Sequence, residues 1–109
     1  MLETTIANGE SLSSLIELGS LTLVGIEIPA GWTAANLTLQ TTNESGGTLV
    51  DVYDKAGSEY TITVGGASRF IVLDKSDLQG IGRFIKLRSG TSGTPVNQGA
   101  DRVLKLIVK

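Results

Sequence analysis

The chain contains neither cysteine nor histidine, and this double absence excludes several kinds of chemistry. Without cysteine there can be no disulfide and no thiolate metal site, so stability has to come from packing or from assembly with other chains. Without histidine, the chain lacks the most common general base and the most common transition-metal ligand. Nucleophilic catalysis that depends on histidine is therefore excluded, and we expect the chain not to be an enzyme.

Positive charge and long apolar runs are also scarce. Nine basic residues stand against eleven acidic ones, and no aromatic-interleaved basic stripe exists, so we expect no nucleic-acid partner. No apolar run approaches the roughly 20 residues of a membrane span, so we expect no membrane partner. The first five residues lack the basic start and apolar run of a secretory signal, so we expect a protein used without export.

Glycine is plentiful where proline is rare, with 14 glycines against two prolines. This ratio favours many tight turns between short strands. Apolar residues make up 40% of the chain and charged residues 18%, which is typical of a folded domain and not of a disordered segment. We expect one domain over residues 1–109, in which residues 1–8 form an N-terminal arm or an edge strand.

Apolar and polar side chains alternate along most of the chain, which is the period of a β-strand. Strands are expected at residues 2–6, 16–18, 21–28, 37–40, 49–53, 60–64, 70–73, 84–88 and 102–109. A change of phase predicts a β-bulge near Val24 and Gly25, and Pro29 should end that strand. Only residues 10–16 offer a helical turn. The pattern predicts an all-β, single-domain, jelly-roll-like β-sandwich of roughly eight antiparallel strands, with a closed barrel as the main alternative.

Five aspartates in turns are the candidate ligands for a cation such as calcium: Asp51, Asp54, Asp74, Asp77 and Asp101. Carboxylate oxygens from loops suit calcium, but no EF-hand spacing is present. The ordinary interpretation is that these side chains are solvated or cap backbone amides in turns. We therefore expect no bound metal and no cofactor.

Trp32 is the only tryptophan and lies in a loop that follows Pro29. It could be a stacking platform for a sugar or an anchor at a partner interface. The favoured interpretation is a plug that closes one end of the sandwich.

Two stretches of the chain carry a recognisable pattern. The first is residues 29–40, PAGWTAANLTLQ, which continues through a Ser/Gly-containing loop to VYDKAG at residues 52–57. The second is KLRSGT at residues 86–91, followed by PVNQGADR at residues 95–102. Together they resemble a family of small virion proteins of tailed bacteriophages, which includes standalone capsid decoration (cement) proteins and modules of tail or baseplate proteins.

The resemblance implies a jelly-roll domain that works as a virion component. We expect a capsid decoration protein, made in the bacterial cytoplasm and located on the capsid surface, where it bridges subunits of the major capsid protein. A homo-oligomer is expected, with a homotrimer over three-fold positions favoured. The alternative is a tail or baseplate module that binds host glycan or other tail proteins. A non-viral adhesion or carbohydrate-binding domain is a third class, but it would normally show export signals and a richer aromatic face.

The expected contact surface begins with the N-terminal arm, which could add a strand to the exposed sheet edge of a neighbouring subunit. A second group, around residue 15, follows no clean inward alternation and could either contact the capsid or cover one end of the sandwich. The candidate interface residues are Leu2, Thr4, Ile6, Leu12, Leu15, Ile16 and Trp32.

Overall fold

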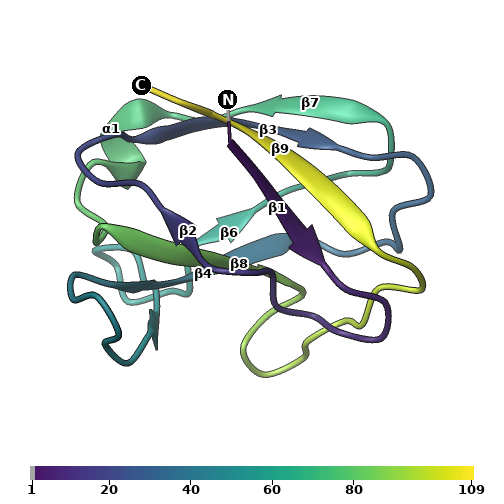
Figure 1. Cartoon of the computed structure of the whole chain (residues 1–109), viewed down its shortest axis with the longest axis horizontal. Coiled ribbons are helices and arrows are strands. Elements are labelled where there is room, and N and C mark those ends of the chain that lie inside the picture. Colours follow the sequence, from purple (N-terminus) through teal and green to yellow (C-terminus); the bar gives the residue numbers. More distant parts are fainter. Residues whose placement is uncertain (1) are drawn as a thin grey trace.

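Two antiparallel β-sheets face each other in the computed structural model, which describes residues 2–109 (Figure 1). The upper layer in Figure 1 contains, in spatial order, β1 (Leu2–Ile6), β9 (Arg102–Val108), β3 (Leu23–Ile28) and β7 (Arg69–Val72). The lower layer contains β2 (Ile16–Glu17), β8 (Phe84–Ser89), β4 (Leu37–Thr42) and β5 (Val50–Asp51), and β6 (Thr61–Ile62) also pairs with β4. A single helical turn, α1 (Lys75–Leu78), connects β7 to β8.

The strands pair in a nested order that makes the chain a rolled-up hairpin. The first strand pairs with the last, β2 pairs with β8, β3 pairs with β7, and β4 pairs with β5 and β6. Two further pairings, β3 with β9 and β4 with β8, complete the sheets. This is the strand order of a jelly roll. The expected jelly-roll-like sandwich is therefore confirmed, and the closed-barrel alternative is wrong.

The core lies between the two sheets and consists mostly of leucine and isoleucine. Alternate side chains of each strand point inward, so that Ile26 on β3, Leu87 on β8 and Leu104 on β9 are fully buried. Each buried aliphatic side chain contributes about 1.5–3 kcal/mol relative to an exposed one. The alternation in the sequence therefore supplies the apolar surface that holds the sheets together.

β3 contains the predicted bulge and ends where proline was expected to end it. Its register against β9 shifts between Leu23 and Gly25. A Cβ atom at Gly25 would lie 2.8 Å from two ring carbons of Phe70, so the missing side chain leaves room for that ring on the outside of the sheet. The strand ends at Ile28, directly before Pro29.

The helical turn lies elsewhere than expected. Residues 10–16 are not helical, because Leu12 bridges to Arg88 and Ser13 bridges to Ile6, which holds the segment extended between the two sheets. The turn forms instead at α1, where the Asp74 side chain accepts a hydrogen bond from the Ser76 backbone N–H and caps the helix. Among the described residues, no helix is long and apolar enough to cross a membrane.

The strands expected at residues 49–53 and 60–64 are shorter in the structure. β5 and β6 share one edge of β4, because β5 pairs with Gln40 and Thr41 while β6 pairs with Leu37 and Thr38. Each of them can therefore pair with only part of the β4 edge. The chain between them forms a hairpin that projects from this edge.

The N-terminal segment is an edge strand and not a free arm. It pairs with β9 over its whole length, from Leu2 opposite Leu106 to Ile6 opposite Arg102. Its outer edge is partly covered, because the Ser14 backbone N–H donates to the Thr5 carbonyl oxygen at 3.0 Å. The addition of this strand to the sheet of a neighbour stays a prediction, because β9 pairs with one edge of β1 and Ser14 bonds to only part of the other edge.

We predict that Gly90→Ala destabilises the domain by about 1–3 kcal/mol more than Gly9→Ala. Both glycines have positive φ, so both substitutions carry the same kind of backbone strain. A Cβ at Gly90 would also lie 2.5 Å from the Thr94 carbonyl oxygen, whereas a Cβ at Gly9 meets no atom within 4 Å. Urea denaturation of both variants measures the difference, and equal unfolding free energies would contradict the packing described here.

Candidate functional site

The candidate interface residues do not form one exposed surface. Thr4, Ile6 and Ile16 are buried, because their strands turn these side chains toward the space between the sheets. Leu2 and Leu12 are half-buried. Leu15, with 51% of its surface exposed, is the member of the set that a partner could reach most easily.

Trp32 is buried and closes part of the sandwich. Its indole Nε1 donates to the Ala35 carbonyl oxygen at 3.1 Å, and its ring belongs to the hydrophobic core. This placement agrees with the plug interpretation. It leaves the ring too buried to serve as a stacking platform for a sugar.

The candidate metal ligands act as turn and loop acceptors. Asp54 Oδ1 accepts hydrogen bonds from the backbone N–H groups of Ala56 and Ser58, and Asp101 Oδ1 accepts one from Asn8. Over residues 2–109, no group of three or more His, Cys, Asp or Glu side chains is arranged to hold a metal ion. Asp54, Asp74 and Asp101 therefore stabilise turns and loops. Asp51 and Asp77 instead accept hydrogen bonds from the side chains of Arg88 and Tyr60.

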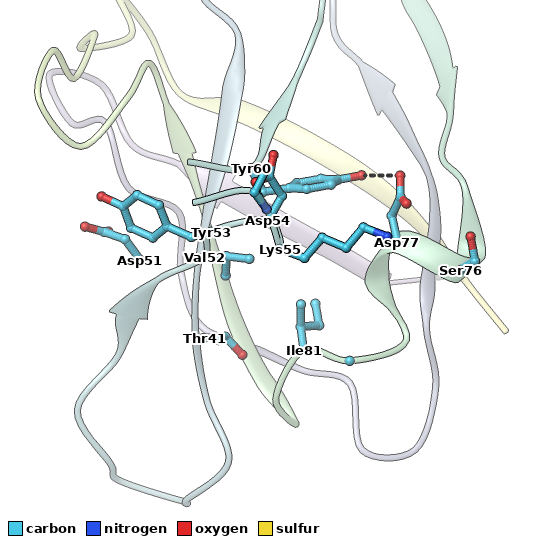
Figure 2. Close-up of a pocket in the computed structure, with 12 residues that line it drawn as sticks. Thr41, Asp51, Val52, Tyr53, Asp54, Lys55, Tyr60, Ser76, Asp77 and Ile81 are labelled. Atoms are coloured by element: carbon cyan, nitrogen blue, oxygen red, sulfur yellow. Dashed lines mark hydrogen bonds between the residues drawn. The ribbon is translucent and has the colours of Figure 1, made fainter. Parts of the chain in front are cut away.

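A groove of about 760 Å³ lies between the β5–β6 hairpin and the segment that contains α1 (Figure 2). The hairpin contributes residues 51–56 and Tyr60, and the facing wall contributes Ser76, Asp77, Gly80 and Ile81. Val52 and Ile81 supply apolar surface, and Asp54, Lys55 and Asp77 supply charge. The groove is thus amphipathic, like many sites that bind a ligand or a partner side chain.

Tyr60 joins the two walls of the groove. Its hydroxyl donates to Asp77 Oδ2 at 3.3 Å, as the dashed line in Figure 2 shows. Burial and the nearby negative charge of Asp77 raise the pKa of Tyr60 above its ordinary value of 10.0, so its hydroxyl stays protonated and able to donate well above neutral pH. Tyr53, on the same hairpin, is 56% exposed and offers an accessible aromatic ring beside the groove.

Arg88 fixes the hairpin to the sheet. Its guanidinium binds Asp51 Oδ1 at 2.6 Å and Glu59 Oε2 at 3.1 Å, so it contacts both ends of the hairpin. Only 7% of the Arg88 side chain is exposed. The Glu59 carboxylate also accepts a hydrogen bond from the Ser92 backbone N–H. The groove wall that carries Tyr53 is therefore held by charge-assisted hydrogen bonds.

Sequence reasoning missed this ion-pair cluster. Alternation places Lys86 and Arg88 on the same outward face of β8, and the two look equivalent in the sequence. Only the folded hairpin distinguishes them, because it covers Arg88 and leaves Lys86 half-buried. A signal was present in the two acidic residues that flank the expected turn, Asp51 and Glu59, but it did not identify their partner.

Sequence reasoning also missed the exposed apolar side chains on two edge strands. On β7, Phe70 is 52% exposed and Val72 is 81% exposed. Val50 on β5 is also exposed, close in sequence to Tyr53. β7 and β5 are the last strands of their sheets, on the side opposite to β1 and β2. This side of the sandwich therefore presents apolar surface that the fold leaves uncovered.

We predict that Arg88→Met lowers the free energy of unfolding by about 2–4 kcal/mol, because it leaves the carboxylates of Asp51 and Glu59 without their cation. Lys86→Met, on the same strand and face, is the matched control and should cost less than about 1 kcal/mol. Urea denaturation of both variants tests this. If the two variants were equally stable, Arg88 would not be what holds the hairpin.

We predict that Asp51 makes the stability of the domain sensitive to acid. The hydrogen bond from Arg88 holds the pKa of Asp51 below its ordinary value of 3.8, despite the opposing effect of burial. A depressed folded-state pKa adds stability above the unfolded-state pKa, and this stability is lost as the pH falls through the folded-state pKa. Asp51→Asn should therefore lose less stability than the parent chain below about pH 4.

Thermal denaturation as a function of pH measures this difference between Asp51→Asn and the parent chain. In the Arg88→Met background, Asp51→Asn should change the acid dependence less, because the guanidinium that lowers the pKa of Asp51 most is gone and only the hydrogen bond from Gln40 still lowers it. An identical acid dependence of Asp51→Asn and the parent chain would contradict the role given to this pair.

Three comparisons with known proteins bear on the identity of the chain. No family model, no curated protein and no solved structure matches it. A functional interpretation therefore has to start from the strand order, the groove and the sequence pattern.

Proposed function

We propose that this chain is a virion structural protein of a tailed bacteriophage, and specifically a capsid decoration protein that bridges subunits of the major capsid protein on the outer surface of the shell. Two features support the proposal: the resemblance over residues 29–57 and 86–102, and the jelly-roll strand order that this resemblance implies. The observation that carries the docking role is the amphipathic groove beside the exposed Tyr53.

The groove suits a loop of a capsid subunit that carries an apolar side chain next to a lysine or arginine. Val52 and Ile81 would contact the apolar side chain, since they provide the apolar lining. Three charged groove residues form no ion pair within residues 2–109: the acidic Asp54 and Asp77 and the basic Lys55. The excess of negative charge favours a basic neighbour. Tyr53 would supply the aromatic anchor that protein interfaces favour.

The way the hairpin is held supports tight docking at low cost. Because Arg88 ties both of its ends, little conformational entropy would be lost when a capsid loop binds. A homo-oligomer would present several grooves at once, and several modest contacts made together bind strongly. Binding only to the expanded shell would stabilise that shell by mass action.

A tail or baseplate module that binds host glycan is the second candidate function. The observation that favours it is the presence of Tyr53 and Tyr60 in a groove that also offers carboxylate oxygens and the Lys55 ammonium group. Aromatic rings and charged hydrogen-bonding groups suit the apolar faces and hydroxyls of a sugar. A glycan would change the fluorescence of the tyrosines, whereas the buried Trp32 should respond little.

We predict that Tyr53→Ala weakens binding to expanded, DNA-filled, tail-less heads of the encoding phage by about 30-fold, as expected when an interface anchor is removed. Val103→Ala, which truncates an exposed side chain on the other sheet, is the matched control and should bind like the parent chain. Co-sedimentation with heads stripped of the protein measures occupancy. If the parent chain does not bind these heads and is recovered only with tails, the decoration proposal is wrong.

A further inference from the structure

β7 is an unprotected edge of the four-stranded sheet. Within the described part of the chain, it pairs with β3 alone, in an unbroken register from Arg69 opposite Ile28 to Val72 opposite Gly25. Exposed edge strands usually carry lysine, proline or a bulge that prevents pairing with another chain. The β7 sequence, RFIV, has neither lysine nor proline, and its Phe70 and Val72 side chains are exposed. Such an edge is a template for a further strand.

The hydrogen-bond pattern shows which residues of β7 face outward. The Leu73 backbone N–H donates to the Val24 carbonyl oxygen. Because hydrogen-bonded and non-hydrogen-bonded pairs alternate in an antiparallel ladder, Ile71 also bonds toward β3. The backbone N–H and C=O groups of Phe70 and Val72 therefore point away from β3, toward the open edge. These are also the two residues whose side chains lie exposed.

We propose that the β7 edge pairs with the β7 edge of a second copy of this chain, antiparallel and about a two-fold axis at Ile71. In this register Phe70 of each copy lies opposite Val72 of the other, and each such pair exchanges both backbone hydrogen bonds. An aromatic residue opposite a β-branched one is a favourable cross-strand pair, and the symmetry provides it twice. The two four-stranded sheets would become one continuous sheet.

Charge and symmetry favour a second copy as the occupant. β7 begins with Arg69 and is followed by Asp74, so antiparallel pairing brings the basic end of each strand toward the acidic end of the other. Parallel pairing would bring like charges together. A ring built through this sheet would instead need β7 to pair with β1, whose outer edge is already bonded to Ser14. Pairing of identical edges closes as a dimer.

The residues that would pair are distinct from those of the proposed capsid contact, because no residue of β7 lines the groove. It goes beyond the proposed function, since the pairing needs no capsid. A two-fold pair also differs from the expected homotrimer, and would present two grooves in a fixed relative orientation.

Sedimentation velocity of the full chain over micromolar to millimolar concentrations tests the pairing. The parent chain should dimerise, whereas Phe70→Lys/Val72→Lys and Phe70→Glu/Val72→Glu should each stay monomeric, because like charges oppose each other across the axis. A mixture of the two variants should form a heterodimer, because lysine then faces glutamate. Val103→Lys, an exposed residue on the same sheet away from the edge, should dimerise like the parent chain.

A cross-link provides a second test that needs no charged substitution. The chain has no cysteine, so Ile71→Cys introduces a single thiol at the proposed axis. Facing residues of a non-hydrogen-bonded pair lie close enough for a disulfide, so mild oxidation should give a covalent dimer. Val103→Cys should not cross-link under the same conditions. A monomeric parent chain, or a dimer unaffected by the Phe70 and Val72 substitutions, would overturn the proposal. Tyr53→Ala should dimerise like the parent chain even if it fails to bind capsids, so the two proposals can fail separately.

Discussion

The pairing of the first strand with the last is the constraint on which the rest of the structure depends. β1 and β9 lie at opposite ends of the chain, and they pair from Leu2 opposite Leu106 to Ile6 opposite Arg102. This is the outermost of the nested strand pairs. With this pair formed, β2 meets β8 and β3 meets β7, and the inward side chains of both sheets form one aliphatic core. The fold thus relies on contacts between residues that are distant in sequence, and such contacts form only after long loops close.

The nested order also decides where the molecule can make contacts. β1 and β2 form the edges of the two sheets on one side of the sandwich. The extended segment around Ser13 runs between these two edges and covers part of that side. The opposite side ends in β7 and in the β5–β6 hairpin, where no other strand among residues 2–109 pairs with the outer edge of β7 and apolar side chains lie exposed. The groove forms there because α1 and the hairpin face each other without filling the space between them. This side of the sandwich therefore offers both a groove and exposed apolar side chains.

The sequence predicted the local features of the fold well and its long-range contacts poorly. The bulge at Gly25 and the strand end before Pro29 follow from backbone properties of single residues, so both could be predicted. Alternation shows that Thr4 and Ile6 share a face, but it does not show that β9 pairs with their strand and buries them. Arg88 illustrates the same limit, because its two carboxylate partners lie on a hairpin whose position depends on the folded sheet.

The candidate site was the least predictable part, because it consists of surfaces that the fold leaves uncovered rather than of reactive residues. We propose that this uncovered side docks the domain onto a viral shell. Electron microscopy of intact particles of the encoding phage measures this directly. We expect many copies arranged regularly over the shell, each with the Tyr53 side toward the major capsid protein. Copies confined to the tail, or absent from the particle, would rule out this docking.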